Sequence, residues 1–507
     1  MMRSRCQLDF CSRLFLASSL IIIIASIIPS NEAAPPGSLV TQLPGFSGTL
    51  PSQHHGGYVS FNDKNLYYYF VSSERNPSED PVMLWLNGGP GCSSFDGFVY
   101  EHGPFNYEKG TSNGSLPILH LNPYSWSKVS NMIYLDSPCG VGLSYSNNQS
   151  NYVTDDFKTA IDSHTFLLKW FELYPEFAKN PFYISGESYA GVYVPMLSSE
   201  VVKGIQAGVQ PVINFKGYLV GNGVTDDTYE GLESYLQFVH GMGLISNDIN
   251  EEVEANCKNV TNPTDACRKS FTKVNKCVSG LNVYDILDSC YHDPEAQAKA
   301  QGNVSLPLSF QQLGKTERPL KVRKRMYGRA WPLGPITHVN GSRNLPSWPV
   351  LLQQMSLHGS VPCVNDEVAT AWLNDESVRQ AIHAEPISVT GPWEICSDKI
   401  DYGFGADSMM PYHRNLTMQG YPALIYSGDH DMCVPFTGTQ AWTRGMGYSI
   451  TDEWRPWISN EQVAGYLQGY AHNLTFLTIK GAGHTVPEYK PSESLDFYSR
   501  WLAGKPI

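Results

Sequence analysis

Short apolar runs that end in glycine or small polar residues recur along this 507-residue chain, and they limit its fold more than any other feature. Uninterrupted apolar runs of this length are typical of strands buried on both faces of a sheet. Residues 154–174 begin with Thr154 and acidic residues and continue with apolar residues at helical spacing, which predicts a helix capped by this threonine. Strand, helix and strand in alternation predict a mostly parallel sheet covered by helices. The apolar runs lie at residues 81–87, 131–138, 181–185, 214–222, 423–429 and 474–483.

Two further regions complete the predicted organisation. Residues 58–70 contain two aromatic, β-rich runs around the turn residues 62–65, which predicts an antiparallel hairpin. Residues 226–347 break the alternation, because their first half is polar and helix-prone and their second half has few apolar residues. We therefore expect a mainly helical cap inserted between two parts of a core, residues 35–225 and 348–507.

A basic run, KVRKRMYGR at residues 321–329, lies in the second half of this insertion. It is either a solvated loop or a site where a protease cuts an exposed linker. In the second case, a linker around residues 297–345 could be excised.

The N-terminus has the layout of a secretory signal peptide, which we expect to cover residues 1–34. Basic residues precede an apolar run at residues 14–28, and small residues follow it. An uncleaved membrane anchor is the alternative, but the run falls short of the roughly 20 residues needed to span a bilayer. We expect a protein of the secretory pathway, secreted or vacuolar, with no stable insertion in the membrane.

Glycosylation signals and cysteines agree with this compartment. Seven Asn-x-Ser/Thr sites occur, and each accepts a glycan only where it is exposed in the lumen. The nine cysteines after the predicted signal indicate several disulfide bonds and at least one odd thiol. No C-x-x-C pair indicates zinc, so we expect no metal and no other cofactor. The glycosylation sites are Asn113, Asn148, Asn259, Asn303, Asn340, Asn415 and Asn473.

Length and charge narrow the class of protein further. The chain is long enough for one large α/β enzyme with insertions. Its net charge of −13 argues against nucleic acid as a partner, because binding phosphates needs a basic face. An acidic surface suits an acidic or extracellular compartment.

The stretch PFYISGESYAGVYVP places Ser188 between a predicted strand and a predicted helix. A nucleophile elbow, G-x-S-x-G, needs small neighbours because the strand turns sharply into a helix with the serine at its crest. Gly186 fits this pattern, whereas Ala190 replaces the second glycine and Gly191 follows at once. The alternative is an ordinary capping or turn serine.

Candidates for an acid and a base lie downstream of this serine. A serine hydroxyl becomes a nucleophile when a histidine accepts its proton and a carboxylate orients that histidine. On α/β-hydrolase sheets the three groups follow strands in the order serine, acid, histidine. Asp429 and Asp431 follow one predicted strand and His484 follows the next, but their spacing leaves the choice between the two aspartates open.

A glycine-rich loop, NGGPGCSS at residues 87–94, follows the first of the apolar runs. An oxyanion hole needs backbone N–H groups aimed at the developing charge. The residue after the nucleophile, Tyr189, would supply one N–H group and this loop the other, since paired glycines let the backbone approach a substrate. A simple tight turn is the alternative.

Four motifs, in this order along the chain, resemble those of the serine carboxypeptidases, especially those of plants: WLNGGPGCSS, GESYAGVYVP, SGDHDMCVP and GAGHTVPEYKP. The resemblance extends from about Phe46 to Leu502. It implies an α/β-hydrolase fold, with a mostly parallel central sheet and an inserted, mainly helical cap. The implied activity is the release of C-terminal amino acids from peptides and proteins, through an acyl-enzyme on the serine.

The same resemblance assigns the catalytic residues. It implies a triad of Ser188, Asp431 and His484, and thereby selects between the two aspartates. It also implies an oxyanion hole formed by the amides of Gly89 and Tyr189.

A carboxypeptidase must also recognise the free C-terminal carboxylate of its substrate. By resemblance, Asn87, Gly88, Glu101 and Glu187 hold this group. Two carboxyl groups that face a third can form hydrogen bonds only if some are protonated, so their pKa values should be raised. We therefore expect substrate capture at acidic pH that weakens as the pH rises.

The resemblance also implies how most cysteines pair, and that the chain could mature into two disulfide-linked chains, as in some plant relatives. The resemblance implies no partner for Cys139, Cys277 or Cys433. Either one of these is a reactive thiol near the site or they are inert, buried cysteines. The implied pairs are Cys92 with Cys396, Cys257 with Cys267, and Cys290 with Cys363.

Two other functions compete with peptide hydrolysis. Acyltransferases of the same fold use the same triad on glucose esters, but they tend to lose the residue matching Asn87 and to carry Asp in place of Glu187. A non-catalytic binding protein would lack a triad residue or an oxyanion glycine, and none is missing. The oligomeric state stays open, with a homodimer among the alternatives.

Overall fold

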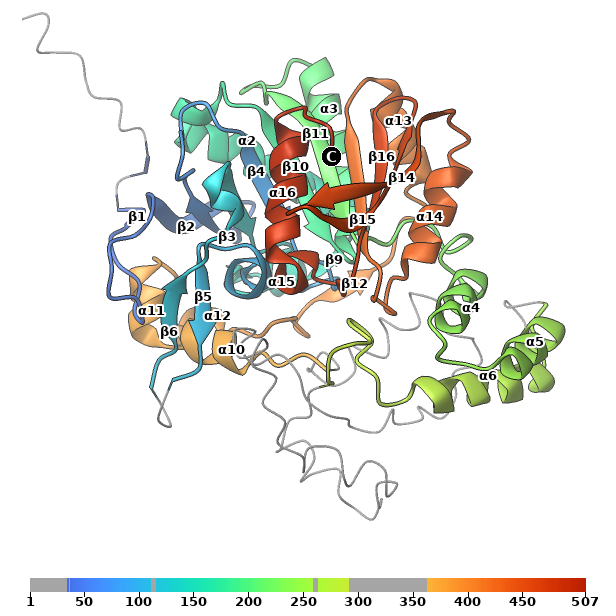
Figure 1. The fold of residues 1–507 in the computed structure, drawn as a ribbon. Coiled ribbons are helices and arrows are strands. Elements are labelled where there is room, and N and C mark those ends of the chain that lie inside the picture. The colour runs from blue at the N-terminus through green and yellow to red at the C-terminus, as the bar shows by residue number, and fades with distance from the viewer. Residues whose placement is uncertain (1–33, 36, 111–114, 259–262, 291–362) are drawn as a thin grey trace, which may run out of the picture.

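The computed structural model describes residues 34–35, 37–110, 115–258, 263–290 and 363–507, and a 12-stranded sheet lies at the centre of this part of the chain (Figure 1). Six neighbouring strands of the sheet are mutually parallel. Each one coincides with an apolar run of the sequence, so the predicted fold class is confirmed. In spatial order they are β7 (Asn131–Leu135), β4 (Val82–Leu86), β10 (Phe182–Glu187), β11 (Phe215–Gly221), β13 (Ala423–Gly428) and β16 (Leu474–Ile479).

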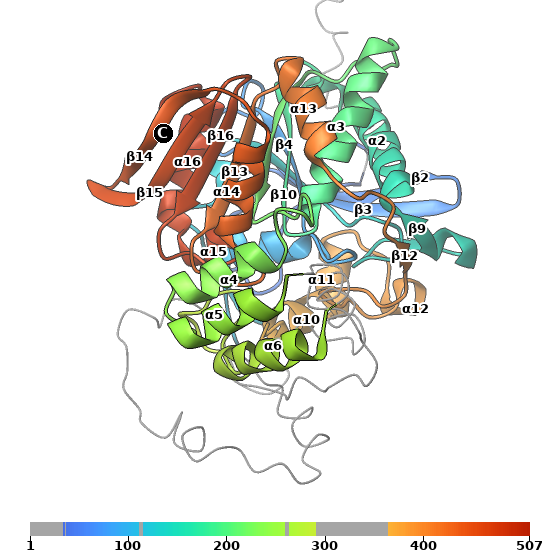
Figure 2. The ribbon, with the colours of Figure 1, turned by 90° about the vertical axis from the view of Figure 1, so that its right-hand side faces the viewer.

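These strands are predominantly apolar, which suits a sheet with helices on both faces. Successive side chains of a strand point to opposite faces. In β4, Leu84 joins a core that contains Trp170, whereas Trp85 joins the opposite core with Phe497. Figure 2 shows the sheet between α16 on one side and α2, α3 and α13 on the other. The helices are α2 (Asp156–Leu173), α3 (Ala190–Gln206), α13 (Met410–Met418) and α16 (Pro491–Leu502).

Antiparallel strands extend the sheet at both edges. The predicted hairpin at residues 58–70 is present, with Asn62 and Asp63 in left-handed conformations at its turn. The hairpin of β14 and β15 at the other edge was not predicted, because much of β14 is exposed and polar and Pro456 interrupts its strand pattern. The edge strands are β1 (Leu39–Val40), β2 (His54–Phe61), β3 (Lys64–Val71), β8 (Tyr145–Ser146), β15 (Gln462–Tyr470) and β14 (Ile450–Ser459).

The predicted cap of helix α2 is wrong by one residue. The side chain of Asp155 accepts a hydrogen bond from the backbone N–H of Lys158 at 2.8 Å and caps the helix. Thr154 instead lies in the short strand β9 (Val153–Asp155), where it pairs with Tyr402 of β12 (Asp401–Gly403). An aspartate next to a threonine offers the better acceptor at this position, and the sequence pattern does not separate the two.

The first part of the predicted cap insertion forms three helices beside the sheet (Figure 2). They share a small hydrophobic core of their own, which includes Leu236, Val253 and Phe271. Several predicted segments lie outside the described residues. They are the signal peptide up to residue 33, the linker around residues 297–345, the basic run at 321–329 and the boundary at 347. The cap helices are α4 (Leu232–Gly241), α5 (Asn247–Asn256) and α6 (Asp265–Val278).

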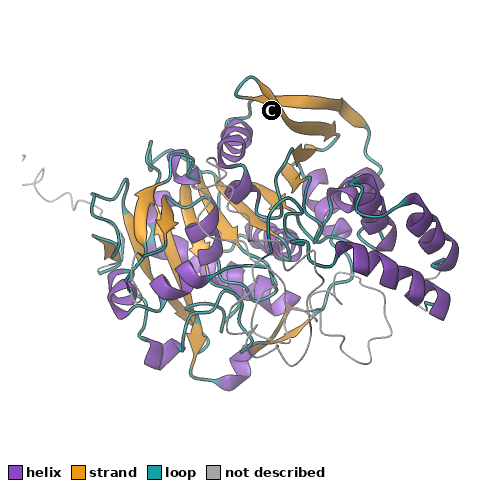
Figure 3. Cartoon of the chain, turned by 60° about the horizontal axis from the view of Figure 1, so that its bottom comes forward, coloured by secondary structure: helices purple, strands orange, loops and turns teal. Residues whose placement is uncertain are grey.

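Shorter elements surround the central sheet, and Figure 3 shows its strands between helices. Among the described residues, no helix is both long and apolar enough to cross a membrane. The remaining strands are β5 (Phe105–Glu108) and β6 (Ile118–Leu121), and the remaining α-helices are α10 (Glu367–Leu373), α11 (Glu376–Ala381), α12 (Ile387–Thr390), α14 (Phe436–Gly445) and α15 (Val486–Tyr489). In the same part of the chain, four short helices of other types are η1 (Gly97–Glu101), η2 (Trp126–Lys128), η3 (Gln149–Tyr152) and η4 (Pro175–Phe177).

Candidate active site

Ser188 lies at the sharp turn between strand β10 and helix α3. Its φ angle of 63° is in the left-handed region, which few residues other than glycine adopt. The turn is held from both sides: the N–H of Ser188 donates to the carbonyl of Gly221 at 3.1 Å, and the N–H of Val224 donates to the carbonyl of Ser188 at 3.0 Å. A strained serine at a strand-to-helix turn is the geometry of a nucleophile elbow.

The structure explains why the elbow motif tolerates Ala190. A methyl group on Gly186 would lie 2.4 Å from the carbonyl oxygen of Leu86 and 2.6 Å from the Cβ of Ala190. A methyl group on Gly191 would lie 2.3 Å from the carbonyl oxygen of Val224. The two glycines are therefore required by close packing, whereas position 190 has room for a methyl group.

The acid and the base of the predicted triad lie together. His484 Nδ1 is 2.7 Å from Asp431 Oδ2, and both side chains are buried. Asp429, the other candidate, instead forms an ion pair with His430 at 2.7 Å and accepts the N–H of Gly481. Geometry therefore selects Asp431 as the partner of His484, as the resemblance implied.

Asp431 is fully buried, and three further donors stabilise its carboxylate. Asn222 Nδ2 donates to Oδ2 at 2.8 Å, and the backbone N–H groups of Cys433 and Val434 donate at 2.8 and 3.2 Å. Sequence reasoning missed Asn222, although it directly follows β11, the strand beside β13, from which the acid comes. That position at the carboxyl edge of the sheet was the available signal.

A segment of the cap region clamps the two loops that carry the acid and the base. The N–H of His484 donates to the carbonyl of Tyr284 at 2.6 Å, and the N–H of Met432 donates to the carbonyl of Val283 at 2.9 Å. The Tyr284 ring also lies 5.2 Å from the imidazole of His484, measured between ring centres. The two hydrogen bonds use backbone atoms, so no sequence motif predicts them.

Within the described part of the chain, the hydroxyl of Ser188 forms no hydrogen bond with His484. Catalytic hydrogen bonds of this kind are often long before substrate binds. The three residues nonetheless follow the ends of β10, β13 and β16, on one side of the sheet and in the order that the sequence predicted.

The glycine-rich loop lies directly against the elbow. A methyl group on Gly88 would lie 2.4 Å from the backbone nitrogen of Tyr189 and 2.8 Å from the Cβ of Ser188. Gly89 has a φ angle of 109°, which disfavours any side chain there. The backbone of this loop therefore lies directly against the N-terminal end of α3. Helix α3 adds the positive end of its dipole at this contact.

The buried carboxylate of Asp136 holds the far end of the same loop. Its Oδ1 accepts the hydroxyl of Ser93 at 2.6 Å and the N–H of Ser94 at 3.0 Å, and its Oδ2 accepts the N–H of Leu143 at 2.8 Å. Burial raises the pKa of Asp136 to about 6, while these hydrogen bonds oppose the shift.

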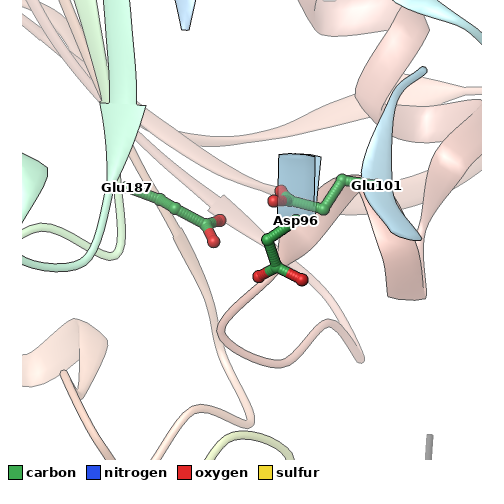
Figure 4. A group of neighbouring side chains, drawn as sticks. All are labelled: Asp96, Glu101 and Glu187. Carbon is green, nitrogen blue, oxygen red and sulfur yellow. The ribbon is translucent and has the colours of Figure 1, made fainter. Parts of the chain in front are cut away.

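Beside the elbow, three carboxyl groups face one another (Figure 4). Oxygen atoms of Asp96, Glu101 and Glu187 lie within 4.8 Å of each other, and all three residues are buried. Asn87 Nδ2 donates to Glu101 at 3.0 Å and to Glu187 at 3.2 Å. The structure thus brings together three of the four residues that the resemblance assigns to carboxylate binding, and the fourth, Gly88, directly follows Asn87.

Two members of this site escaped the sequence analysis. Asp96 follows the glycine-rich loop without any motif of its own. The buried hydroxyl of Tyr426 has no hydrogen-bond partner within the described residues, and burial raises the pKa of Tyr426, with smaller contributions from Glu187 and Glu101. Tyr426 fits because Gly221, which pairs with both Glu187 and Tyr426, leaves room for its ring.

The three cysteine pairs implied by the resemblance form disulfide bonds in the structure. Cys92 joins Cys396, Cys257 joins Cys267, and Cys290 joins Cys363. Cys139 and Cys433 are buried thiols, and Cys277 is an exposed one. Burial raises the pKa of Cys433, with a further contribution from Asp431, and burial raises that of Cys139 to about 12. Both buried thiols therefore stay protonated and unreactive.

Three of the seven predicted glycosylation sites fall on described residues. Asn148, Asn415 and Asn473 are all exposed, as a glycan acceptor must be. The other four, Asn113, Asn259, Asn303 and Asn340, lie outside the described residues.

The sheet order, the elbow and the buried acid and base pair define the class of α/β hydrolases. The family model described as "Serine carboxypeptidase" matches residues 44–504, and the chain belongs to this family. It is 60% identical over 492 residues to "Serine carboxypeptidase-like 20" of Arabidopsis thaliana, covering 96% of this chain and 97% of that protein. It is also 60% identical over 481 residues to "Serine carboxypeptidase 1" of Hordeum vulgare, covering 94% of each.

A solved structure shares the fold. The crystal structure of a prohormone-processing carboxypeptidase from Saccharomyces cerevisiae matches with a TM-score of 0.63 at 20% identity, covering 91% of this chain and 94% of that chain. At that identity the likeness concerns the fold alone.

Proposed function

We propose that this serine carboxypeptidase acts through a triad of Ser188, His484 and Asp431. His484 accepts the hydroxyl proton while Ser188 Oγ attacks the carbonyl carbon of the last peptide bond. Asp431 holds the imidazole in the required orientation, supported by the 2.7 Å contact between Asp431 Oδ2 and His484 Nδ1. The amides of Gly89 and Tyr189 stabilise the oxyanion that forms.

The first half of the reaction ends in an acyl-enzyme. The peptide C–N bond breaks, His484 returns its proton to the leaving amine, and the C-terminal amino acid departs. Water then attacks the acyl-enzyme with His484 as the base, which releases the shortened peptide and restores the hydroxyl of Ser188.

The observation that carries exopeptidase action is the buried group of Asn87, Glu101 and Glu187 beside the elbow. An endopeptidase has no need of such a group, because its substrate presents an uncharged chain there. We propose that these side chains, with the amide of Gly88, bind the substrate's free carboxylate. Asn87 donates through its amide, and the glutamates donate while they are protonated.

This arrangement predicts substrate capture at acidic pH. Carboxyl groups this close together cannot all be ionised, because the like charges repel in a buried site. As the pH rises and the last proton is lost, the site repels the substrate carboxylate. KM should then rise by up to about ten-fold per pH unit, as expected for loss of one required proton.

The test is the pH dependence of KM for wild type and Glu187→Gln, measured with N-blocked dipeptides. Glutamine donates hydrogen bonds without titrating, so the rise of KM with pH should flatten in the variant. Glu453→Gln, an exposed change on β14, is the matched control and should keep the wild-type profile. An identical profile in wild type and Glu187→Gln would rule out this role for Glu187.

The cellular setting is part of the same proposal. The predicted signal peptide, the exposed sequons and the three disulfide bonds support passage through the secretory pathway, followed by secretion or delivery to the vacuole. Peptides and proteins with a free C-terminus would be the substrates.

A further inference from the structure

The carboxylate of Asp156 lies at the start of helix α2, 1% exposed, close to the nucleophile but outside the proposed triad. Its Oδ1 accepts the hydroxyls of Tyr189 at 2.7 Å and Tyr402 at 2.8 Å. Its Oδ2 accepts the backbone N–H groups of Gly405 at 2.7 Å and Ala406 at 3.1 Å. No ion pair reaches it from the rest of the described chain. Four donors thus converge on one buried acceptor.

Two of these donors are tyrosine hydroxyls that remain protonated. Burial raises the pKa of Tyr189 and of Tyr402, in each case with smaller contributions from neighbouring tyrosines and from Asp156. Both hydroxyls donate to the same oxygen atom, Oδ1 of Asp156. These hydrogen bonds therefore hold the Asp156 cluster rigidly in place, as a fixed point for its neighbours.

On one side, this fixed point holds the residue that follows the nucleophile. The amide of Tyr189 is one of the two proposed oxyanion donors, and the side chain of the same residue is bound to Asp156. The ring of Tyr189 is further enclosed by Tyr193, Tyr402 and Phe404, with ring centres 5.3, 6.0 and 5.8 Å away. Rotation of Tyr189 would have to break these contacts.

On the other side, Asp156 holds the middle of residues 395–409, which we call the strap. The strap begins at the glycine-rich loop, where Cys396 is bonded to Cys92 and the N–H of Ser397 donates to the carbonyl of Gly91 at 2.9 Å. It ends beyond β11, where the N–H of Met409 donates to the carbonyl of Thr225 at 2.8 Å.

The two ends of the strap are therefore attached to both flanks of the elbow. Val224, next to Thr225, donates its N–H to the carbonyl of Ser188, and Gly91 follows the proposed oxyanion glycine by two positions. We propose that Asp156 is a positioning residue, which fixes Tyr189 and the strap so that the two oxyanion amides keep their spacing around Ser188. The proposal rests on the proposed function.

The test compares two ligands for each variant. A blocked peptide aldehyde forms a tetrahedral adduct with the serine, and its oxyanion needs both amides, whereas the corresponding blocked peptide alcohol forms no adduct. Asp156→Ala should reduce the affinity for the aldehyde, relative to the alcohol, by about ten-fold, a fraction of the loss expected when an oxyanion donor is deleted. It should also lower kcat more than it changes KM.

Asp156→Asn is the conservative variant. Its side-chain oxygen still accepts the two backbone N–H groups. Its NH2 group can donate to both tyrosine oxygens once the two hydroxyl groups rotate. It should therefore retain most of the aldehyde affinity. If Asp156→Ala does not fold, Tyr189→Phe removes only the hydrogen bond on the side of the nucleophile and should show a smaller loss in the same direction.

Asp155→Ala is the matched control. The Asp155 carboxylate caps the helix and pairs with Lys158, whereas Asp155 meets the strap through backbone pairing opposite Gly403, which alanine keeps. This variant should lower thermal stability and leave the ratio of the two affinities unchanged. An equal loss in Asp155→Ala and Asp156→Ala, or a folded Asp156→Ala with the wild-type ratio, would overturn the inference.

Reaction with a fluorophosphonate separates this inference from the proposed function. The reagent modifies an activated serine without using the carboxylate-binding group. A wild-type protein that reacts with it but releases no amino acids would refute the proposed substrate, while the slower reaction expected for Asp156→Ala could still be measured.

Discussion

Single residues near the nucleophile adopt conformations or charge states that are unfavourable in free energy, and surrounding contacts offset this. Ser188 adopts a left-handed conformation, which costs a non-glycine residue on the order of 1 kcal/mol. Backbone hydrogen bonds on both sides of the turn hold it there. One of these comes from Val224, at the start of a turn that depends on Glu230.

Glu230 binds this turn while half-buried, with Asp226 and Asp227 nearby. Its Oε2 accepts the N–H groups of Thr225 at 2.7 Å and Asp226 at 3.0 Å. Burial raises the pKa of Glu230 from 4.5 to about 8, with smaller contributions from Asp227 and Asp226. The side chain is therefore neutral in an acidic compartment.

In Glu230→Gln, the free energy of unfolding should fall less with rising pH than it does in wild type. Below the unfolded-state pKa near 4.5, both states keep the proton and Glu230 costs nothing. As the pH rises toward 8, only the unfolded state ionises, so the free energy of unfolding falls, on the order of 2 kcal/mol after solvent screening. Denaturant unfolding at acidic and slightly alkaline pH measures this slope.

The slope should be shallower in Glu230→Gln, because glutamine does not titrate. Glu233→Gln, an exposed change three residues along the chain, should keep the wild-type slope. If Glu230→Gln loses as much stability between the two pH values as wild type does, Glu230 is not the group responsible.

At the scale of elements, the glycine-rich loop and the elbow must approach each other without side chains between them. Gly88→Ala tests this requirement directly. Its methyl group would lie 2.4 Å from the nitrogen of Tyr189, so the loop or the elbow must shift. Displacing an oxyanion donor should lower kcat/KM by about 10²- to 10³-fold.

Gly241→Ala is the matched control for this change. A methyl group there meets no atom within 4 Å, at the end of helix α4, so activity should be retained. Steady-state kinetics on one blocked dipeptide, with circular dichroism to verify folding, distinguishes the two variants. A fully active Gly88→Ala would mean that the close approach has no part in catalysis.

The predictable elements are those whose signals are local. The six parallel strands follow from continuous apolar runs, and the elbow follows from small residues around Ser188. The β14 and β15 hairpin could not be predicted, because its exposed polar face and Pro456 hide its strand pattern. Asn222 and Tyr284 act through contacts with residues more than 190 positions away, which one sequence does not reveal.

At the scale of the whole molecule, two hydrophobic cores and a cap with its own core position the site at the carboxyl ends of the parallel strands. Spacing left the choice between Asp429 and Asp431 open, and the resemblance implied Asp431. In the structure Asp431 contacts His484, whereas Asp429 pairs with His430. The acyltransferases share this framework, so the fold and the triad alone do not separate the two activities.

The central claim is that a serine attack is directed to the last peptide bond by recognition of a free carboxylate. The most direct measurement is amino-acid release from N-blocked dipeptides with free or amidated C-termini, at acidic and neutral pH, with Ser188→Ala as the control. The account predicts release from the free acids at acidic pH, much slower release from the amides, and none with Ser188→Ala. Equal release from acids and amides, or acyl transfer from a glucose ester without peptide hydrolysis, would contradict it.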